Sequence, residues 1–192
     1  MNNTELKTLE YPPLTEDLEE AKTHLDEYGM ALIANVLDKD EVEEMDKRLN
    51  EQFLGEEKYK VGSKVRGDEG LGKESSEEEK VSRLVWNLIN KGDCFLKLID
   101  HPKILPLIQH LIGERVSLCS MGAHMNGSGN EKMALHQDQW PLVPHPMDFP
   151  FMANVMYLIS DNSPKNGGTR LIPGSHKWPL IDYKTANGEE IQ

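Results

Sequence analysis

The hydrophobic pattern of the chain changes at Glu114, and this change constrains the fold more than any other feature of the sequence. Before Glu114, apolar residues recur at the three- and four-residue spacing of amphipathic helices. After it, short apolar segments are bounded by Gly, Pro, Asn and Ser, which is typical of strands separated by turns. Helices followed by strands predict an α+β or mainly β protein in which N-terminal helices buttress an antiparallel sheet or barrel.

Capping residues divide the first half of the chain into helices. Thr15 is predicted to cap a helix over 16–28 that Gly29 ends, and Asp38 to cap a second helix over 39–55. Three shorter helices are predicted over 81–90, 94–100 and 101–113, the last beginning near Pro102 and ending at Gly113. Between these helices, 30–37 predicts a short buried strand, and 55–80, rich in Gly, Lys and Glu, predicts a long loop.

The second half predicts strands, at 115–126, 132–140, 151–160 and 167–173. The 192-residue sequence contains no internal repeat and no sharp shift in composition. We therefore expect a single domain over 1–192, with a helical part at about 14–113 and a β part at about 114–192.

Composition excludes several classes of partner. The net charge of −12 argues against nucleic acid, whose phosphates attract basic surfaces, and no apolar run is long enough to cross a bilayer. Residues 1–20 are polar and acidic and lack the apolar core of a signal peptide. Two cysteines, Cys94 and Cys119, form no disulfide framework. These features predict a cytoplasmic protein and leave its oligomeric state open.

The segment "MALHQDQW", residues 133–140, places His136 and Asp138 two residues apart. Side chains at i and i+2 of a strand project from the same face, so an imidazole and a carboxylate would emerge side by side. They are two of the three groups in the 2-His-1-carboxylate triad that binds non-heme Fe(II) and leaves positions open for other ligands. So short a motif is by itself more often a surface pair than a metal site.

The surrounding sequence adds a second signal. Residues 162–178 read "NSPKNGGTRLIPGSHKW", in which glycines permit a tight connection into a strand and Pro173-Gly174 forms a turn after it. Together with "HQD" and with "YGMALIANVLDKDEVEEM" at 28–45, this segment resembles the phytanoyl-CoA dioxygenase family, over about Leu14 to Trp178. The resemblance implies a double-stranded β-helix, a jelly-roll or cupin-like fold, and an Fe(II)- and 2-oxoglutarate-dependent oxygenase.

Carried to this sequence, the resemblance implies a role for each of several residues. His136 and Asp138 would bind the iron, Thr169 would hydrogen-bond the carboxylate of 2-oxoglutarate, and Asn154 would help to seat the same co-substrate. His176, in "PGSH", would be structural, because the histidine of this turn is usually not a metal ligand in the family. Related iron halogenases have a small residue in place of Asp138, so the carboxylate favours hydroxylation or another oxidation over halogenation.

The family pattern is incomplete within this sequence. The family has a second metal histidine after "PGSH", followed by a basic residue that pairs with the distal carboxylate of 2-oxoglutarate, whereas no histidine follows His176 and no arginine follows Arg170. We expect first that the chain is a fragment and that its β-helix is incomplete at the C-terminus. The alternatives are a truncated product that binds iron weakly, and a complete protein in which His176 or His145 replaces the missing ligand and Arg170 replaces the anchor.

These features predict a dioxygenase that uses dioxygen and 2-oxoglutarate to hydroxylate or otherwise oxidise a C–H bond of a small organic metabolite. Residues 139–152, "QWPLVPHPMDFPFM", either line the substrate pocket or form a rigid loop packed by its own apolar groups. No obvious basic patch fits the phosphates of a coenzyme A thioester. The alternative is a non-catalytic β-helix binding or interaction domain in which H-x-D has no metal role.

Overall fold

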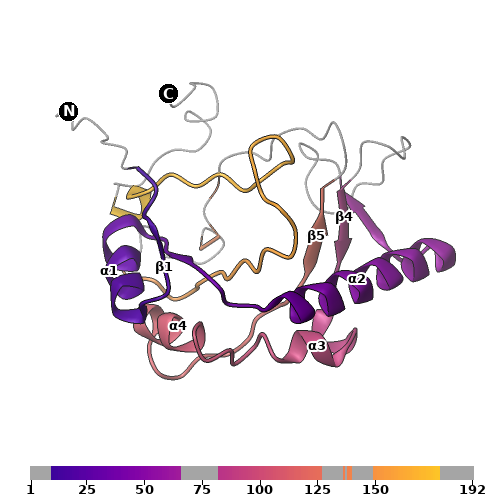
Figure 1. The fold of residues 1–192 in the computed structure, drawn as a ribbon, viewed down its shortest axis with the longest axis horizontal. Helices are drawn as coiled ribbons and strands as arrows, with labels where there is room; N and C mark the ends of the chain where they lie inside the picture. Colours follow the sequence, from indigo (N-terminus) through magenta and orange to yellow (C-terminus); the bar gives the residue numbers. More distant parts are fainter. Residues whose placement is uncertain (1–9, 66–81, 127–135, 137, 140–148, 178–192) are drawn as a thin grey trace.

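The computed structural model describes residues 10–65, 82–126, 136, 138–139 and 149–177, in which helices flank two small sheets (Figure 1). The elements in chain order are β1 (Leu14–Thr15), α1 (Leu18–Tyr28), β2 (Leu32–Ile33), α2 (Lys39–Tyr59), β3 (Ser63–Val65), β4 (Ser82–Val85), η2 (Leu88–Asn90), α3 (Asp93–Leu96), α4 (Leu105–Ile112), β5 (Ala123–Met125) and η3 (Ser175–Lys177). Strands β1 and β2 pair in parallel, and β3, β4 and β5 form an antiparallel sheet with β4 in the centre.

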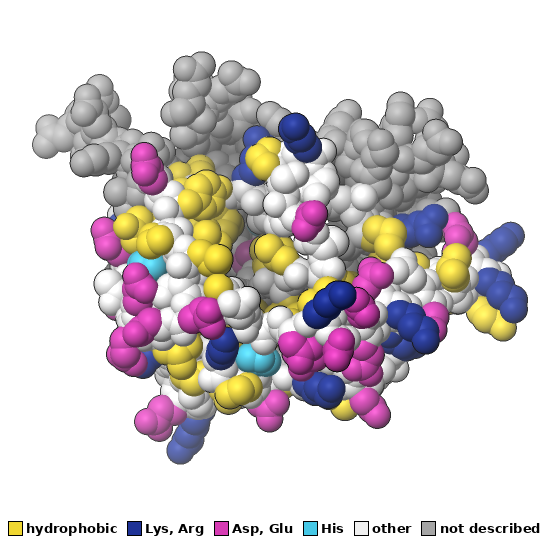
Figure 2. Space-filling model, in the orientation of Figure 1, with side chains coloured by type: hydrophobic (Ala, Val, Ile, Leu, Met, Phe, Trp, Pro, Cys, Tyr) yellow, Lys and Arg dark blue, Asp and Glu magenta, His cyan; other side chains and the backbone are white. Residues whose placement is uncertain are grey.

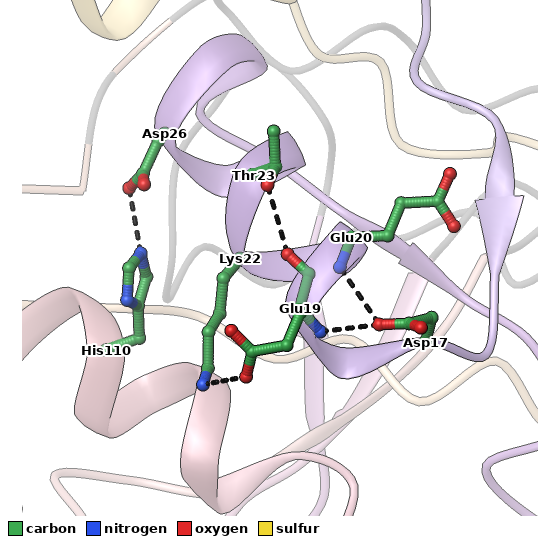
Figure 3. Close-up of polar contacts among 7 residues, drawn as sticks. All are labelled: Asp17, Glu19, Glu20, Lys22, Thr23, Asp26 and His110. Atoms are coloured by element: carbon green, nitrogen blue, oxygen red, sulfur yellow. Dashed lines mark hydrogen bonds and ion pairs between the residues drawn. The ribbon is translucent and has the colours of Figure 1, made fainter.

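Helix α1 begins at a different residue from the predicted one. Asp17 is the N-cap, and its Oδ1 accepts hydrogen bonds from the backbone N–H groups of Glu19 and Glu20 at 2.8 and 3.1 Å (Figure 3). Thr15, the predicted cap, lies in β1, where its Oγ1 accepts a hydrogen bond from Asp17 N at 3.0 Å. Parallel pairing with β2 holds Thr15 in a strand, so the cap moves two residues along the chain. Gly29 ends the helix in the left-handed conformation, as predicted.

A polar contact joins α1 to α4, which packs beside it (Figure 3). His110 of α4 and Asp26 of α1 approach to 2.8 Å between Nε2 and Oδ1. Gly113 follows the last residue of α4, so the predicted end of this helix is confirmed.

Helix α2 has the predicted start but a later end. Asp38 and Glu41 form a reciprocal capping box, which satisfies two backbone donors of the first turn. The helix then continues through Gly55 to Tyr59 and ends at Lys60 in the left-handed conformation, so the prediction that it stops at Gly55 is wrong. A glycine inside a helix costs only about 1 kcal/mol relative to alanine, which the helix-forming residues on both sides offset.

The antiparallel sheet corrects two further predictions. Residues 82–85 form β4, and residues 88–90 form the short 3₁₀ helix η2. The sequence predicts a single helix over 81–90 instead. Leu84 stands opposite Ser63 of β3 and His124 of β5, so β4 gains hydrogen-bonded partners on both edges. Within the predicted loop over 55–80, residues 55–59 belong to α2 and 63–65 form β3, while 66–80 lie outside the described residues. The sheet therefore contains strands from both the predicted helical part and the predicted β part of the chain.

The main hydrophobic core lies where α2, α3 and the three-stranded sheet meet. Its largest fully buried side chain is Phe95, 1% exposed, and the other buried members are Met45, Leu49, Phe53, Val85, Leu88, Cys94 and Leu98. Tyr157 and Ile159, from a segment far along the chain, pack against this cluster. The core therefore holds part of the second half of the chain in place.

Residues 149–174 lie outside the assigned helices and strands, run between the three-stranded sheet and α1, and lead to η3 (Figure 1). Of the predicted strands, only Ala123–Met125 in 115–126 and Leu32–Ile33 in 30–37 lie in assigned strands, while 151–160 and 167–173 lie outside β1–β5. Most of 132–140 lies outside the described residues. The double-stranded β-helix therefore stays a prediction.

The surface is rich in acidic groups, consistent with 33 Asp and Glu against 21 Lys and Arg in the sequence. Figure 2 shows acidic side chains spread over much of one face, with basic side chains among them. In the part of the chain that the structure describes, no helix is both long enough and apolar enough to cross a membrane.

Candidate metal centre

His136 and Asp138 face each other in the structure. Nε2 of His136 lies 3.4 Å from Oδ1 of Asp138, and the two side chains are 47% and 54% exposed. Asp138 lies in a turn, and residue 137 lies outside the described residues, so the strand predicted around the pair stays a prediction. The imidazole and the carboxylate are nevertheless adjacent and accessible from solvent.

The donor atoms of this pair fit two neighbouring positions of a first-row metal ion. Metal–nitrogen and metal–oxygen bonds of about 2.1 Å at right angles place neighbouring ligand atoms about 3 Å apart. The observed 3.4 Å between Nε2 and Oδ1 is close to this separation. One nitrogen and one carboxylate oxygen also match the donor types of the non-heme iron triad.

Asn154 contacts the carboxylate of Asp138 directly. Its Nδ2 donates a hydrogen bond to Oδ2 of Asp138 at 2.6 Å, while Oδ1 of the same carboxylate faces His136. The two oxygens therefore have different partners, and the amide restricts rotation of the carboxylate. The sequence placed Asn154 near the co-substrate and gave no sign of this contact.

Gln139 connects the segment that carries Asp138 to the segment that carries Asn154. Its Oε1 accepts hydrogen bonds from the backbone N–H groups of Phe151 and Met152 at 3.0 and 3.3 Å. Sequence reasoning placed Gln139 only at the start of the substrate loop. A glutamine has no sequence signature for bonding to the backbone of a distant segment, so no signal would have revealed this role.

Tyr157 anchors the Asn154 segment to the core. Its hydroxyl donates a hydrogen bond to the carbonyl oxygen of Leu98 at 2.8 Å, and its ring packs edge-on against His101. Burial raises the pKa of Tyr157 to about 12, so the hydroxyl stays protonated and remains a donor at any physiological pH. The ring of His101 therefore has a packing role.

Thr169 does not join the pair in the described part of the chain. Its side chain is exposed, and no hydrogen bond links it to His136, Asp138 or Asn154 among the described residues. The backbone two residues later is fixed by Tyr11, whose hydroxyl donates to the carbonyl oxygen of Leu171 at 2.9 Å and accepts from its N–H at 3.2 Å. The co-substrate role of Thr169 stays a prediction.

His176 packs against the end of α1. Nε2 of its ring lies 3.2 Å from the carbonyl oxygen of Asp26, and Gly174 N donates to the carbonyl oxygen of Tyr28 at 2.7 Å. The ring lies over Gly29, where a Cβ atom would come within 2.4 Å of Nδ1 of His176. Burial lowers the pKa of His176, which favours the neutral ring. These contacts fit the structural role predicted for this histidine.

We expect Gly29→Ala to destabilise the protein strongly. Gly29 has φ of +73°, and holding a residue with a side chain in such a region costs about 1–3 kcal/mol. The clash with His176 adds to this cost. Equilibrium unfolding in urea measures the loss.

Gly55→Ala is the matched control. Gly55 lies inside α2, and a Cβ atom there meets nothing within 4 Å, so this change should stabilise the protein by about 0.5–1 kcal/mol. Equal effects of the two substitutions would contradict the assignment of Gly29 to a strained and crowded position.

Among the described residues, no group of three or more His, Cys, Asp or Glu is placed to hold an ion. His145, one of the candidate replacements, lies outside them, as do Trp140 and Met147 of the predicted pocket. Phe149 of that pocket is described and 60% exposed.

Comparison with known proteins identifies the family. The family model for phytanoyl-CoA dioxygenase matches residues 25–190, a range that includes His136, Asp138, Asn154 and Thr169. The chain belongs to the phytanoyl-CoA dioxygenase family, as the sequence predicted.

Three curated relatives are named as dioxygenases. Dioxygenase af480 of Aspergillus fumigatus is 30% identical over 178 residues, covering 93% of this chain and 55% of that protein. A probable alpha-ketoglutarate-dependent hypophosphite dioxygenase of Stutzerimonas stutzeri is 29% identical over 119 residues, covering 62% of this chain and 41% of that protein. Dioxygenase sphC of Aspergillus fumigatus is 25% identical over 173 residues, covering 85% of this chain and 46% of that protein. The chain thus spans about half the length of these relatives, and no solved structure matches it.

Proposed function

We propose that the protein is an Fe(II)- and 2-oxoglutarate-dependent dioxygenase that oxidises a C–H bond of a small organic substrate. The observation that carries the proposal is the approach of His136 Nε2 to Asp138 Oδ1 at 3.4 Å, in a chain that belongs to the phytanoyl-CoA dioxygenase family. The name of the Stutzerimonas stutzeri relative, an alpha-ketoglutarate-dependent enzyme, supports the choice of co-substrate.

In this proposal His136 and Asp138 hold the iron, and the third ligand is a histidine outside the described residues. When bound, the iron with 2-oxoglutarate and dioxygen supplies the oxidising power, and 2-oxoglutarate leaves as succinate and carbon dioxide. The protein contributes orientation and a pocket that excludes water. Thr169 is the proposed contact to the co-substrate, together with a basic residue that pairs with its distal carboxylate.

The carboxylate of Asp138 supports hydroxylation or a related oxidation rather than halogenation. A halide ion would need the position that this side chain occupies, and the charge of the carboxylate would repel it. The hydrogen bond from Asn154 holds the carboxylate in place, which leaves less room for such a ligand.

A small metabolite is the proposed substrate class. The net charge of −12 disfavours the highly phosphorylated coenzyme A carrier, because negative surfaces repel phosphate groups. One relative is named for hypophosphite, a small ion rather than a coenzyme A thioester. A double-stranded β-helix fold and a cytoplasmic location complete the proposal.

Anaerobic addition of Fe(II) and 2-oxoglutarate to the full-length protein tests it. We expect a weak charge-transfer absorption band in the visible region that needs both components, and slow conversion of 2-oxoglutarate to succinate once dioxygen is admitted. Zn(II) in place of Fe(II) should give neither signal, because it has no accessible redox change.

A full-length protein that gives no band and binds no Fe(II) would favour a non-catalytic binding domain instead.

A further inference from the structure

We infer that Asn154 is a positioning residue that fixes the carboxylate of Asp138, and that Gln139 fixes Asn154 relative to it. This inference rests on the proposed function, because it assigns Asp138 to the metal. It differs from the predicted role of Asn154, which was direct contact with 2-oxoglutarate.

The two carboxylate oxygens of Asp138 have different partners. Oδ2 of Asp138 accepts the amide of Asn154 at 2.6 Å, and Oδ1 lies 3.4 Å from His136 Nε2. A carboxylate whose Oδ2 is occupied by a donor presents Oδ1 alone on the side of the histidine. Hydrogen bonds to metal-binding carboxylates of this kind orient the ligand and tune its affinity for the metal.

Residues close to Asn154 in the sequence attach it to the rest of the molecule. Tyr157, three residues along the chain, is bonded to Leu98 and packs against the main core. Gln139 holds the backbone of Phe151 and Met152, just before Asn154. The Asn154 segment is thus fixed to the core on one side and to the neighbour of Asp138 on the other.

These contacts order the pair. Asp138 and Asn154 are 16 residues apart in sequence, and Asp138 itself is 54% exposed. An exposed carboxylate with one partner would sample several rotamers. Two further contacts, from Asn154 and through Gln139, restrict it to the rotamer that faces His136.

The test separates binding of the metal from binding of the co-substrate. Mn(II) replaces Fe(II) because it does not oxidise in air during the titration, and its free-ion electron paramagnetic resonance signal reports binding directly. Affinity for 2-oxoglutarate is then measured calorimetrically at saturating Mn(II). The variants are Asn154→Leu, which keeps the size of the side chain but removes the donor, and Asn154→Ser, which retains a shorter donor.

We expect Asn154→Leu to weaken Mn(II) binding by about 10- to 100-fold, the range typical for loss of a partner to a ligand side chain. Asn154→Ser should lose less, and the affinity for 2-oxoglutarate at saturating Mn(II) should stay within about twofold of the parent. Gln139→Met, which removes the acceptor oxygen, should also weaken Mn(II) binding. Gln139→Glu, which keeps an acceptor oxygen, should weaken Mn(II) binding less than Gln139→Met does.

Met156→Ala is the control for general loosening of the segment, because Met156 lies two residues from Asn154 and is 55% exposed. It should leave Mn(II) affinity unchanged. Thermal unfolding of each variant without metal verifies that it folds.

Two results would overturn the inference. One is an Asn154→Leu variant that binds Mn(II) like the parent but binds 2-oxoglutarate more weakly, which would make Asn154 a co-substrate contact. The other is no change in either affinity. Failure of the parent protein itself to bind Mn(II) would instead remove the proposed function, and the positioning role with it.

Discussion

Replacement of His136 by alanine should remove Fe(II) binding and, with it, all conversion of 2-oxoglutarate. The imidazole is one of two described side chains that face the proposed metal position, and the water that would replace it is a poorer donor. Loss of partners that only support a ligand already costs 10- to 100-fold in metal affinity, so loss of the ligand itself should exceed about 100-fold. Titration with Fe(II) under anaerobic conditions, followed through the visible band with 2-oxoglutarate, measures the effect.

His110→Ala is the control for this substitution. His110 pairs with Asp26 between α4 and α1, and an exposed pair of this kind contributes at most about 1 kcal/mol to stability. The variant should therefore keep its metal affinity. Survival of the visible band in His136→Ala at parental Fe(II) concentrations would rule out the assigned ligand.

Replacement of Phe95 by alanine should produce the largest loss of stability of any single substitution considered. Phe95 is 1% exposed and is the largest fully buried side chain of the main core, and Phe→Ala changes in cores typically cost about 3–5 kcal/mol. The free energy of unfolding of native domains is about 5–15 kcal/mol in total, so this change removes a large part of it. Urea unfolding followed by circular dichroism measures it.

The neighbouring residue supplies a matched comparison. Leu96 belongs to the same short helix but is 41% exposed, so Leu96→Ala should cost less than about 1 kcal/mol. If the two variants unfolded at the same urea concentration, the buried Phe95 side chain would contribute no more to stability than the exposed Leu96 side chain, contrary to the prediction. Because Tyr157 and Ile159 pack on the same cluster, Phe95→Ala should also loosen the segment that carries Asn154.

Much of the candidate site was predictable from residue types. The motif "HQD", followed by "NGGTRLIPGSH", predicted the family, and the family model confirms that prediction. The i, i+2 spacing on a strand predicted that His136 and Asp138 lie side by side; the structure places them 3.4 Å apart, with Asp138 in a turn. The amide of Asn154 on Asp138 and the bonds of Gln139 did not follow, because they join segments whose approach depends on the path of the intervening chain.

The sequence by itself determined the local features: the capping box at Asp38, the helix stop at Gly29, and the end of α4 at Gly113. These depend on residues within one or two turns of each other, whose preferences act locally. Only the tertiary structure decided that 82–85 form a central strand rather than a helix, and that Asn154 reaches Asp138. A strand gains its hydrogen bonds from distant segments, and a side-chain contact needs both segments in place, so neither is encoded in any short stretch of the chain.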